Sequence, residues 1–155
     1  MKLYCVRHGE AESATVNPER PLTDMGRLDV EKMARYMGEV GLHIDYLMHS
    51  PKLRAVQTAE IFAKYLNATQ VQQCQTLLDE MNEVEPLIEK LPAWHADTML
   101  VGHFPFMHKL INALLERRVD TDPIFNCPPG TVICLNRYNQ DQWIIGWLLN
   151  PHLVI

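Results

Sequence analysis

The sequence has 155 residues, of which 47% are apolar and 21% are charged, proportions typical of a globular protein with one hydrophobic core. Its formal net charge of −5 argues against a broad basic surface, so we expect no binding to nucleic acids. Because no segment resembles a signal peptide or a membrane span and the four cysteines form no CxxC pair, we expect a single domain over residues 1–155 in the cytoplasm, with reduced thiols and no membrane contact.

The first predicted element is a short buried strand over Lys2–Val6, which ends at Arg7-His8-Gly9. The stretch that follows, residues 10–22, is polar and contains two prolines, which indicates a loop. Thr23 is a suitable N-cap for the next helix, which is expected to end near Gly38. One face of this helix is predicted to be buried and consists of Leu28, Val30, Met33, Ala34 and Met37.

A second short buried strand is predicted over Ile44–Met48. Ser50 and Pro51 follow it and combine two features that favour the start of a helix. The serine side chain can cap the first turn, and proline fits the first helical position. We therefore expect a helix that begins at Ser50-Pro51 and ends near Leu66.

The rest of the sequence continues to alternate between strands and helices. The expected elements are an irregular or extended stretch over 71–78, a helix over 83–91, a strand over 98–101, a helix over 106–115 and two late strands over 131–135 and 143–149. Helices between strands favour a parallel sheet that is covered on both faces, and a short turn favours antiparallel pairing of the late strands. The predicted fold class is α/β, a three-layer α/β/α sandwich with a mostly parallel central sheet and an antiparallel edge.

Three segments with chemically reactive residues directly follow predicted strands. They are Arg7-His8, Ser50-Pro51 and Gly102-His103. In open α/β sheets ligands bind at the carboxyl ends of the strands, where the strand order reverses. We therefore expect these three segments to converge, although they lie far apart in the sequence.

The residues that would meet at this edge suit a phosphoryl dianion. Arg7 and Arg54 carry guanidinium groups, which can each bind two phosphate oxygens. A helix that starts at Ser50 would add backbone N–H groups that favour an anion. His8 and His103 supply two imidazoles. The sequence thus predicts a phosphate-handling site inside an acidic protein.

Four segments carry recognisable motifs: VRHGEA at residues 6–11, PLTDMG at 21–26, SPKLRAVQT at 50–58 and LVGH at 100–103. In this order and spacing they resemble the RHG, PLTxxG and SPxxRAxQT motifs and the second-histidine segment of the histidine phosphatase superfamily. The resemblance extends over essentially the whole chain. It implies a phosphoglycerate mutase-like fold and a phosphatase activity.

The resemblance implies a two-step reaction in which His8 attacks phosphorus and water then hydrolyses the phosphohistidine. A neutral His8 is a competent nucleophile if its other ring nitrogen donates to a fixed acceptor. A protonated His103 is expected to stabilise the transition state together with the two arginines, so no metal or cofactor is implied. The residues expected to bind the phosphoryl group are Arg7, Gly9, Ser50, Arg54 and His103.

The sequence does not decide which residue, if any, acts as the general acid. In the family an acid that follows a Leu-x-Glu pattern commonly protonates the leaving oxygen, and Leu78-Asp79-Glu80 offers Glu80 at that position. A phosphoramidate nitrogen that leaves already protonated does not need this acid. Both a catalytic and a non-catalytic Glu80 are therefore compatible with the sequence.

The substrate class is indicated by two alanines and by the length of the chain. Ala11 and Ala14 occupy positions where many relatives that act on metabolites carry Ser or Thr and then Asn. The chain also has no room for the large insertions that cap the site in those longer enzymes. In both respects it is similar to the small phosphohistidine phosphatases that act on phosphotransfer domains. We therefore expect a monomeric enzyme whose partner is a phosphorylated protein.

Two other functions remain open. A small-metabolite phosphomonoesterase or mutase can use the same scaffold, although Ala11, Ala14 and the short length argue against it. A catalytically inactive phosphate-recognition module is the second alternative. Such a module would be expected to lose its nucleophile or a pocket arginine, whereas this sequence retains all four expected site residues.

Overall fold

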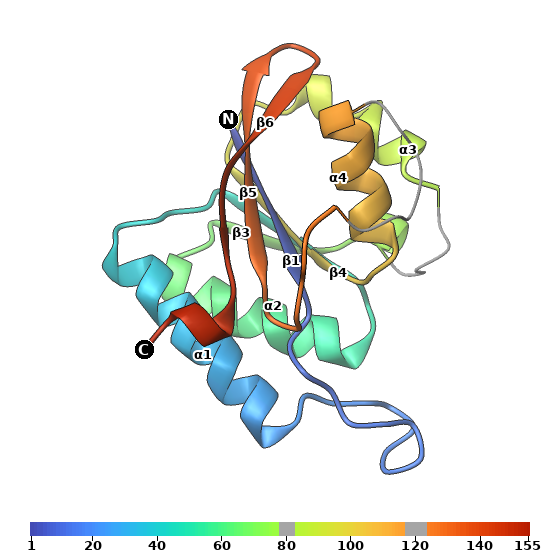
Figure 1. The fold of residues 1–155 in the computed structure, drawn as a ribbon, viewed down its shortest axis with the longest axis vertical. Coiled ribbons are helices and arrows are strands. Elements are labelled where there is room, and N and C mark those ends of the chain that lie inside the picture. Colours follow the sequence, from blue (N-terminus) through green and yellow to red (C-terminus); the bar gives the residue numbers. More distant parts are fainter. Residues whose placement is uncertain (78–82, 117–123) are drawn as a thin grey trace.

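The computed structural model describes residues 1–77, 83–116 and 124–155 (Figure 1). Its strands are β1 (Lys2–Arg7), β2 (Tyr46–His49), β3 (Gln70–Gln73), β4 (Thr98–Gly102), β5 (Val132–Asn139) and β6 (Gln142–Leu149). Its α-helices are α1 (Asp24–Glu39), α2 (Leu53–Leu66), α3 (Glu85–Ile88) and α4 (Phe106–Glu116), with single 3₁₀ turns η1 (Gln75–Leu77), η2 (Leu91–Ala93) and η3 (Pro151–Leu153). None of the helices in these ranges is long and apolar enough to cross a membrane.

The described strands form one sheet in the order β3-β2-β4-β1-β5-β6. The first four strands of this order run parallel, whereas β5 pairs antiparallel with β1, and β6 pairs antiparallel with β5. The predicted mostly parallel sheet with an antiparallel hairpin at one side is therefore confirmed. Strand β1 lies in the middle of the sheet, between β4 and β5. The residues that follow its carboxyl end, His8 and Gly9, therefore lie at the centre of that edge of the sheet.

Helices cover both faces of the sheet, with α1 and α2 on one side and α3 and α4 on the other (Figure 1). The alternation of side chains along β1 shows the two cores. Tyr4 and Val6 are buried with the apolar faces of α1 and α2, whereas Leu3 and Cys5 are buried with α4. A strand buried on both faces must be apolar at every position, which explains the unbroken apolar run that starts the sequence.

Helix α1 confirms the predicted cap but not every residue of the predicted face. The Thr23 hydroxyl accepts a hydrogen bond from the Gly26 N–H at 2.9 Å, and Val30 and Met37 are buried with the rest of the stripe. Leu28, which was assigned to this face, is 60% exposed. Successive residues of a helix turn by about 100°, so Leu28 points some 200° away from Val30.

Helix α2 begins at Leu53, three residues after the predicted start at Ser50-Pro51. Its N-cap residue is Lys52, which makes no side-chain capping bond. Ser50 still has strand-like pairing, since its N–H donates to the Val101 carbonyl at 3.0 Å. The serine therefore belongs to the end of the sheet rather than to the helix, and the prediction that it caps α2 is wrong.

Two other segments are shorter or more regular than expected. Residues 70–73 form the edge strand β3, in a region predicted only as irregular or extended. The predicted helix over 83–91 is reduced to the single turn of α3, followed by the 3₁₀ turn η2. Prolines near the start of both turns favour such short helical pieces.

Gly26 holds the loop over residues 10–22 against the first turn of α1. The Thr23 N–H donates to the Glu10 carbonyl at 3.0 Å, and a Cβ atom on Gly26 would overlap the same carbonyl group. The close approach of loop and helix therefore requires glycine at this position.

Gly26→Ala tests this packing, because two effects predict opposite signs. Helix propensity alone favours alanine by about 1 kcal/mol, but overpacking against backbone costs about 1–3 kcal/mol. We expect a net loss of unfolding free energy in chemical denaturation. The exposed neighbour Arg27 offers the control Arg27→Ala, which should change stability by less than about 0.5 kcal/mol. A stabilised Gly26→Ala protein would contradict the close approach.

Candidate active site

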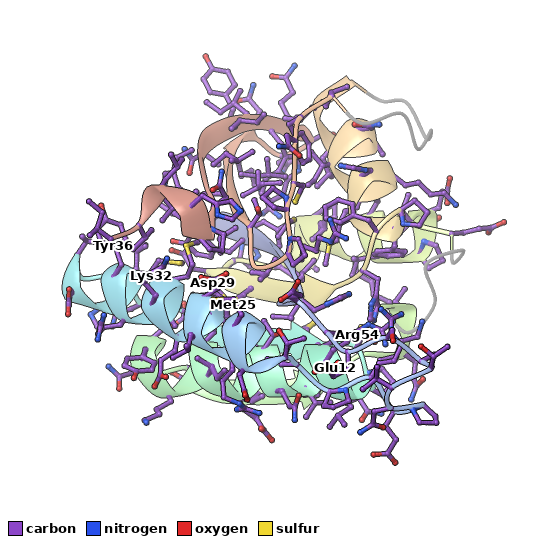
Figure 2. The ribbon with its side chains drawn as sticks, turned by 60° about the horizontal axis from the view of Figure 1, so that its bottom comes forward. Glu12, Met25, Asp29, Lys32, Tyr36 and Arg54 are labelled. Atoms are coloured by element: carbon purple, nitrogen blue, oxygen red, sulfur yellow. The ribbon has the colours of Figure 1, made fainter. Side chains whose placement is uncertain are left out.

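Three segments that are distant in the sequence meet at the carboxyl ends of the adjacent strands β2, β4 and β1. The His8 N–H donates to the Gly102 carbonyl at 3.1 Å, and the Ser50 N–H donates to the Val101 carbonyl at 3.0 Å. These backbone bonds fix the residues after each strand relative to one another. In Figure 2, Arg54 at the start of α2 lies at the same end of the molecule as Glu12 of the loop over residues 10–22.

His8 is held by hydrogen bonds at both ring nitrogens. Its Nδ1 lies 2.7 Å from the Gly9 carbonyl oxygen, and Arg54 Nε lies 3.2 Å from its Nε2. A guanidinium can only donate and a carbonyl can only accept. The two contacts therefore assign the proton to Nδ1 and leave the lone pair on Nε2. This is the tautomer that the sequence analysis required of a nucleophile.

The surroundings of His8 also keep it neutral. Burial lowers its pKa from 6.5 to about 4, and the charges of Arg54 and Arg7 act in the same direction, whereas the bond to Gly9 opposes them. At pH 7 the imidazole is therefore uncharged and its Nε2 lone pair is retained.

Both arginines are fixed by contacts with the protein. Arg54 is only 6% exposed and donates to His8. Arg7 donates from Nη1 to the Cys127 carbonyl at 2.7 Å, and its guanidinium carbon lies 5.5 Å from the centre of the Phe104 ring. Held side chains lose less conformational entropy when they bind an anion. Arg54 thus contacts His8 directly, and Arg7 lies near enough for its charge to lower the pKa of His8.

His103 lies beside His8, with the ring centres 5.1 Å apart. Its Nε2 lies 2.8 Å from the Ser50 hydroxyl oxygen, which also accepts the Lys52 N–H at 3.3 Å. A neutral His103 can therefore accept the serine hydrogen at Nε2 and carry its own proton on Nδ1, or it can donate from Nε2 to the serine oxygen. This Nδ1 is buried and makes no hydrogen bond to any of the described residues. In the first of these tautomers, Nδ1 is a donor that His103 can offer to an oxyanion.

The protein's own groups keep His103 neutral, whereas the expected protonated His103 belongs to the site with a phosphoryl group bound. Burial is the main cause that lowers the pKa of His103 from 6.5 to about 3, and the neighbouring His8 and Arg54 contribute in the same direction. The ring is neutral at pH 7 and can donate only one hydrogen bond besides its bond to Ser50. A phosphoryl dianion beside it would raise this pKa again.

The other predicted site residues have mixed outcomes. Ser50 is fully buried, and its hydroxyl bonds to His103, so the structure gives it a partner other than substrate. The Gly9 N–H donates to the Thr58 hydroxyl at 3.0 Å, which occupies the backbone donor that was expected to bind phosphate. Glu80 lies outside the described residues. Within the described ranges, no group of three or more His, Cys, Asp or Glu side chains could hold a metal ion.

Sequence reasoning missed Arg20 and Thr58. The charge of Arg20 is among those that lower the pKa of both His8 and His103, so this loop residue lies near the imidazoles. It has a left-handed backbone with φ of 51° and donates from Nε to the Glu12 carbonyl at 3.0 Å. A single loop arginine has no periodicity or cap to mark it in a sequence. Thr58 was within a recognised motif, but only the structure shows its bonds.

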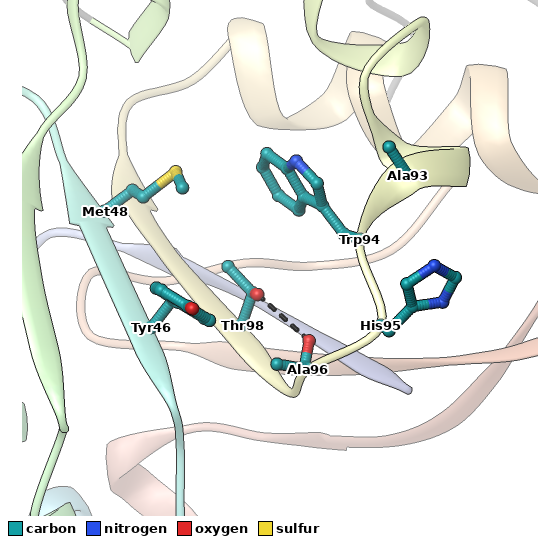
Figure 3. A pocket seen from close by; sticks show the side chains of 7 residues that line it. All are labelled: Tyr46, Met48, Ala93, Trp94, His95, Ala96 and Thr98. Carbon is teal, nitrogen blue, oxygen red and sulfur yellow. Dashed lines mark hydrogen bonds between the residues drawn. The ribbon is translucent and has the colours of Figure 1, made fainter.

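A groove of about 330 Å³ lies at the other end of the sheet, lined by Tyr46, Met48, Trp94, His95 and Thr98 among others (Figure 3). Tyr46 and Thr98 are the first residues of β2 and β4, whereas His8 and His103 follow the last residues of their strands. The groove is therefore separate from the histidine site.

Comparison with known proteins gives one family match and several full-length similarities. The sequence model of the histidine phosphatase superfamily (branch 1) matches residues 3–83. An uncharacterised protein of Picosynechococcus is 33% identical over 121 residues, which cover 74% of this chain and 73% of that protein. Phosphohistidine phosphatase SixA of Escherichia coli is 25% identical and covers 97% of this chain and 94% of SixA.

Rat serine/threonine-protein phosphatase PGAM5 is 27% identical over 99% of this chain, which spans only 57% of the length of that protein. Among solved structures, SixA complexed with tungstate superposes with a TM-score of 0.83 and covers 98% of both chains at 24% sequence identity. A second structure, a SixA-type protein from Agrobacterium tumefaciens, gives a TM-score of 0.78 at 20% identity, with 97% of both chains covered.

The buried histidines predict a loss of stability at mildly acid pH. Their pKa values of about 4 and about 3 in the folded protein lie below the ordinary value of 6.5, so the unfolded chain binds more protons as the pH falls. The unfolding free energy should therefore be unaffected by these groups above about pH 6.5 and should decrease between about pH 6.5 and 4, by on the order of 3 kcal/mol for each histidine.

Denaturant titrations at several pH values would measure this decrease. The slope of unfolding free energy against pH gives the number of protons that the chain takes up on unfolding. In His8→Asn this number should be about one lower than in wild type. An unchanged slope would show that His8 is not the neutral, buried group described above.

Proposed function

The chain belongs to the histidine phosphatase superfamily, and on this premise we propose that it hydrolyses phosphohistidine in proteins through a covalent intermediate on His8. The observation that carries the proposal is the pair of bonds that leaves the Nε2 lone pair of His8 next to the Arg54 guanidinium. A neutral imidazole beside fixed cations is what nucleophilic attack on a phosphoryl dianion needs.

In the first step, the Nε2 lone pair of His8 forms a bond to phosphorus, and the bond from phosphorus to the leaving nitrogen breaks. Before Nε2 can attack, the hydrogen bond from Arg54 Nε to this lone pair must break. The Arg54 guanidinium can then donate to the charged phosphoryl oxygens instead. Arg7 and Arg54 then share the negative charge of the phosphoryl oxygens, and His103 donates from Nδ1.

The leaving imidazole needs no external acid when its second nitrogen already carries a proton. It then departs as neutral histidine. In the second step, water attacks phosphorus, the bond to His8 Nε2 breaks, and both water protons remain with the released phosphate. His8 returns to its neutral form with the proton still on Nδ1, where the Gly9 carbonyl accepts it.

The protein substrate is supported by the comparison with SixA, which shares nearly its whole length with this chain, and by Ala11 and Ala14. The similarity to PGAM5, described as a serine/threonine-protein phosphatase, supports a second candidate, a phosphoester in a protein. A phosphoester oxygen is a poorer leaving group than a protonated imidazole, so this alternative depends on a general acid such as Glu80.

We also propose a cytoplasmic location. None of the four cysteines is paired, and three of them are buried. Free thiols are typical of reducing compartments, where disulfides rarely persist.

The covalent intermediate is tested by incubating the protein with a phosphotransfer domain that carries radiolabelled phosphate on histidine. We expect wild type to retain acid-labile, alkali-stable label after rapid quenching. His8→Gln should retain none and should lose at least about 10³-fold in turnover. The exposed residue His43 offers the control His43→Gln, which should label and turn over like wild type. If wild type turned over substrate without retaining label, the covalent mechanism would be wrong.

The substrate class is tested by a panel at equal concentrations: the phosphohistidine domain, a phosphoserine peptide and glucose 6-phosphate. We expect kcat/KM to be highest for phosphohistidine by at least about 10²-fold, a difference of roughly 2.7 kcal/mol in the barrier. In Glu80→Gln the activity on phosphohistidine should stay within about threefold of wild type. Preference for the sugar phosphate or for phosphoserine would overturn the proposed substrate and favour one of the alternatives.

A further inference from the structure

Four hydrogen bonds link His8 and Arg54 in a closed circuit. The His8 Nδ1–H donates to the Gly9 carbonyl at 2.7 Å, and the Gly9 N–H donates to the Thr58 hydroxyl at 3.0 Å. The Thr58 hydroxyl donates to the Arg54 carbonyl at 2.7 Å. The circuit closes where Arg54 Nε donates to His8 Nε2 at 3.2 Å. Each member therefore constrains the next one.

The direction of every bond in this circuit is fixed by chemistry. Backbone N–H groups and guanidinium can only donate, and carbonyl oxygens can only accept. The Thr58 hydroxyl must consequently accept from Gly9 and donate to Arg54, which uses its single hydrogen. The other tautomer of His8 would place two acceptors together at the Gly9 carbonyl and two donors together at Arg54 Nε.

Thr58 provides a second connection between the two halves of the site, besides the direct bond from Arg54 to His8. It lies in the second turn of α2, one turn after Arg54, and Gly9 belongs to the segment after β1. Thr58 is fully buried, so water cannot take the place of its hydroxyl. The same residue, Gly9, donates its N–H to Thr58 and accepts the His8 proton at its carbonyl oxygen.

We propose that Thr58 is a positioning residue that holds His8 in the Nδ1–H tautomer and keeps Arg54 in register with it. The catalytic meaning of this role rests on the function proposed above, in which His8 Nε2 is the nucleophile. The position of the proton on His8 can be measured without any assay of turnover, so this part of the role does not depend on the proposed function.

Loss of the hydroxyl would affect both neighbours. Thr58→Val keeps the shape of the side chain but leaves the buried Gly9 N–H without an acceptor. The Gly9 segment must then shift to find another partner, which moves the carbonyl that accepts the His8 proton. In a fraction of the protein molecules, His8 would carry its proton on Nε2, which then has no lone pair for attack on phosphorus.

The test is imidazole nitrogen NMR at pH 7 together with rates of phosphoenzyme formation, with radiolabelled phosphohistidine domain as the phosphoryl donor. His8 resonances are assigned by their absence in His8→Gln. Wild type and Thr58→Ser should show His8 protonated at Nδ1 and should form phosphoenzyme at rates within about threefold of each other. Thr58→Val should show a second tautomer and a rate about 10- to 100-fold lower, since small displacements of a nucleophile have effects of this size.

Thr98→Val is the matched control. Thr98 is also buried, at 2% exposure, and its hydroxyl donates to a single backbone carbonyl, that of Ala96, at 3.1 Å. It lies at the opposite end of β4, in the groove of Figure 3. This variant loses a buried threonine hydroxyl without touching the circuit. It should keep the tautomer and the rate of wild type.

Three results would overturn the proposal: a folded Thr58→Val with unchanged tautomer and rate, a Thr58→Ser that behaves like Thr58→Val, or a wild-type His8 protonated at Nε2. The last result needs no variant, so the proposal remains testable if Thr58→Val does not fold. If wild type formed no phosphoenzyme but Thr58→Val still changed the tautomer, the positioning role would stand and the proposed function would fall.

Discussion

The hydrogen bond from Arg54 Nε to His8 Nε2 is the constraint on which the rest of the site depends. Because a guanidinium only donates, this bond requires a lone pair on Nε2 and a proton on Nδ1, which the Gly9 carbonyl accepts. The nearby positive charge and burial together keep the ring neutral by lowering its pKa to about 4. One contact thus holds the Nε2 lone pair of His8 and the Arg54 guanidinium side by side, as the proposed attack on phosphorus requires.

The sheet makes this contact possible, since it fixes the backbone on both sides of the site. His8 and Ser50 donate backbone hydrogen bonds to successive residues of β4, Gly102 and Val101, immediately before His103. The cationic groups are therefore gathered in a chain whose formal net charge is −5. This local positive charge suits the phosphoryl group of the proposed substrate.

Sequence patterns predicted the elements with strong apolar periodicity and failed where other forces decide. The buried strands β1 and β4 and the helix α1 were predicted to within a residue or two, because each buries a regular apolar pattern. All four residues of the edge strand β3 are exposed, so it has no such pattern. Ser50 was assigned as a helix cap because serine is a favoured N-cap residue. In the structure its hydroxyl instead forms a hydrogen bond with His103, which is distant in the sequence. Motifs named the site residues, whereas long-range partners such as the Cys127 carbonyl on Arg7 could not be read from the sequence.

A crystal structure with orthovanadate would show whether His8 Nε2 is the nucleophile, because vanadate adopts the five-coordinate geometry of the phosphoryl transition state. We expect vanadium bonded to His8 Nε2, with Arg7, Arg54 and His103 Nδ1 within hydrogen-bond distance of its oxygens and the His8 Nδ1–H still donating to the Gly9 carbonyl. Vanadate bound away from His8, or bonded through Nδ1, would contradict this expectation.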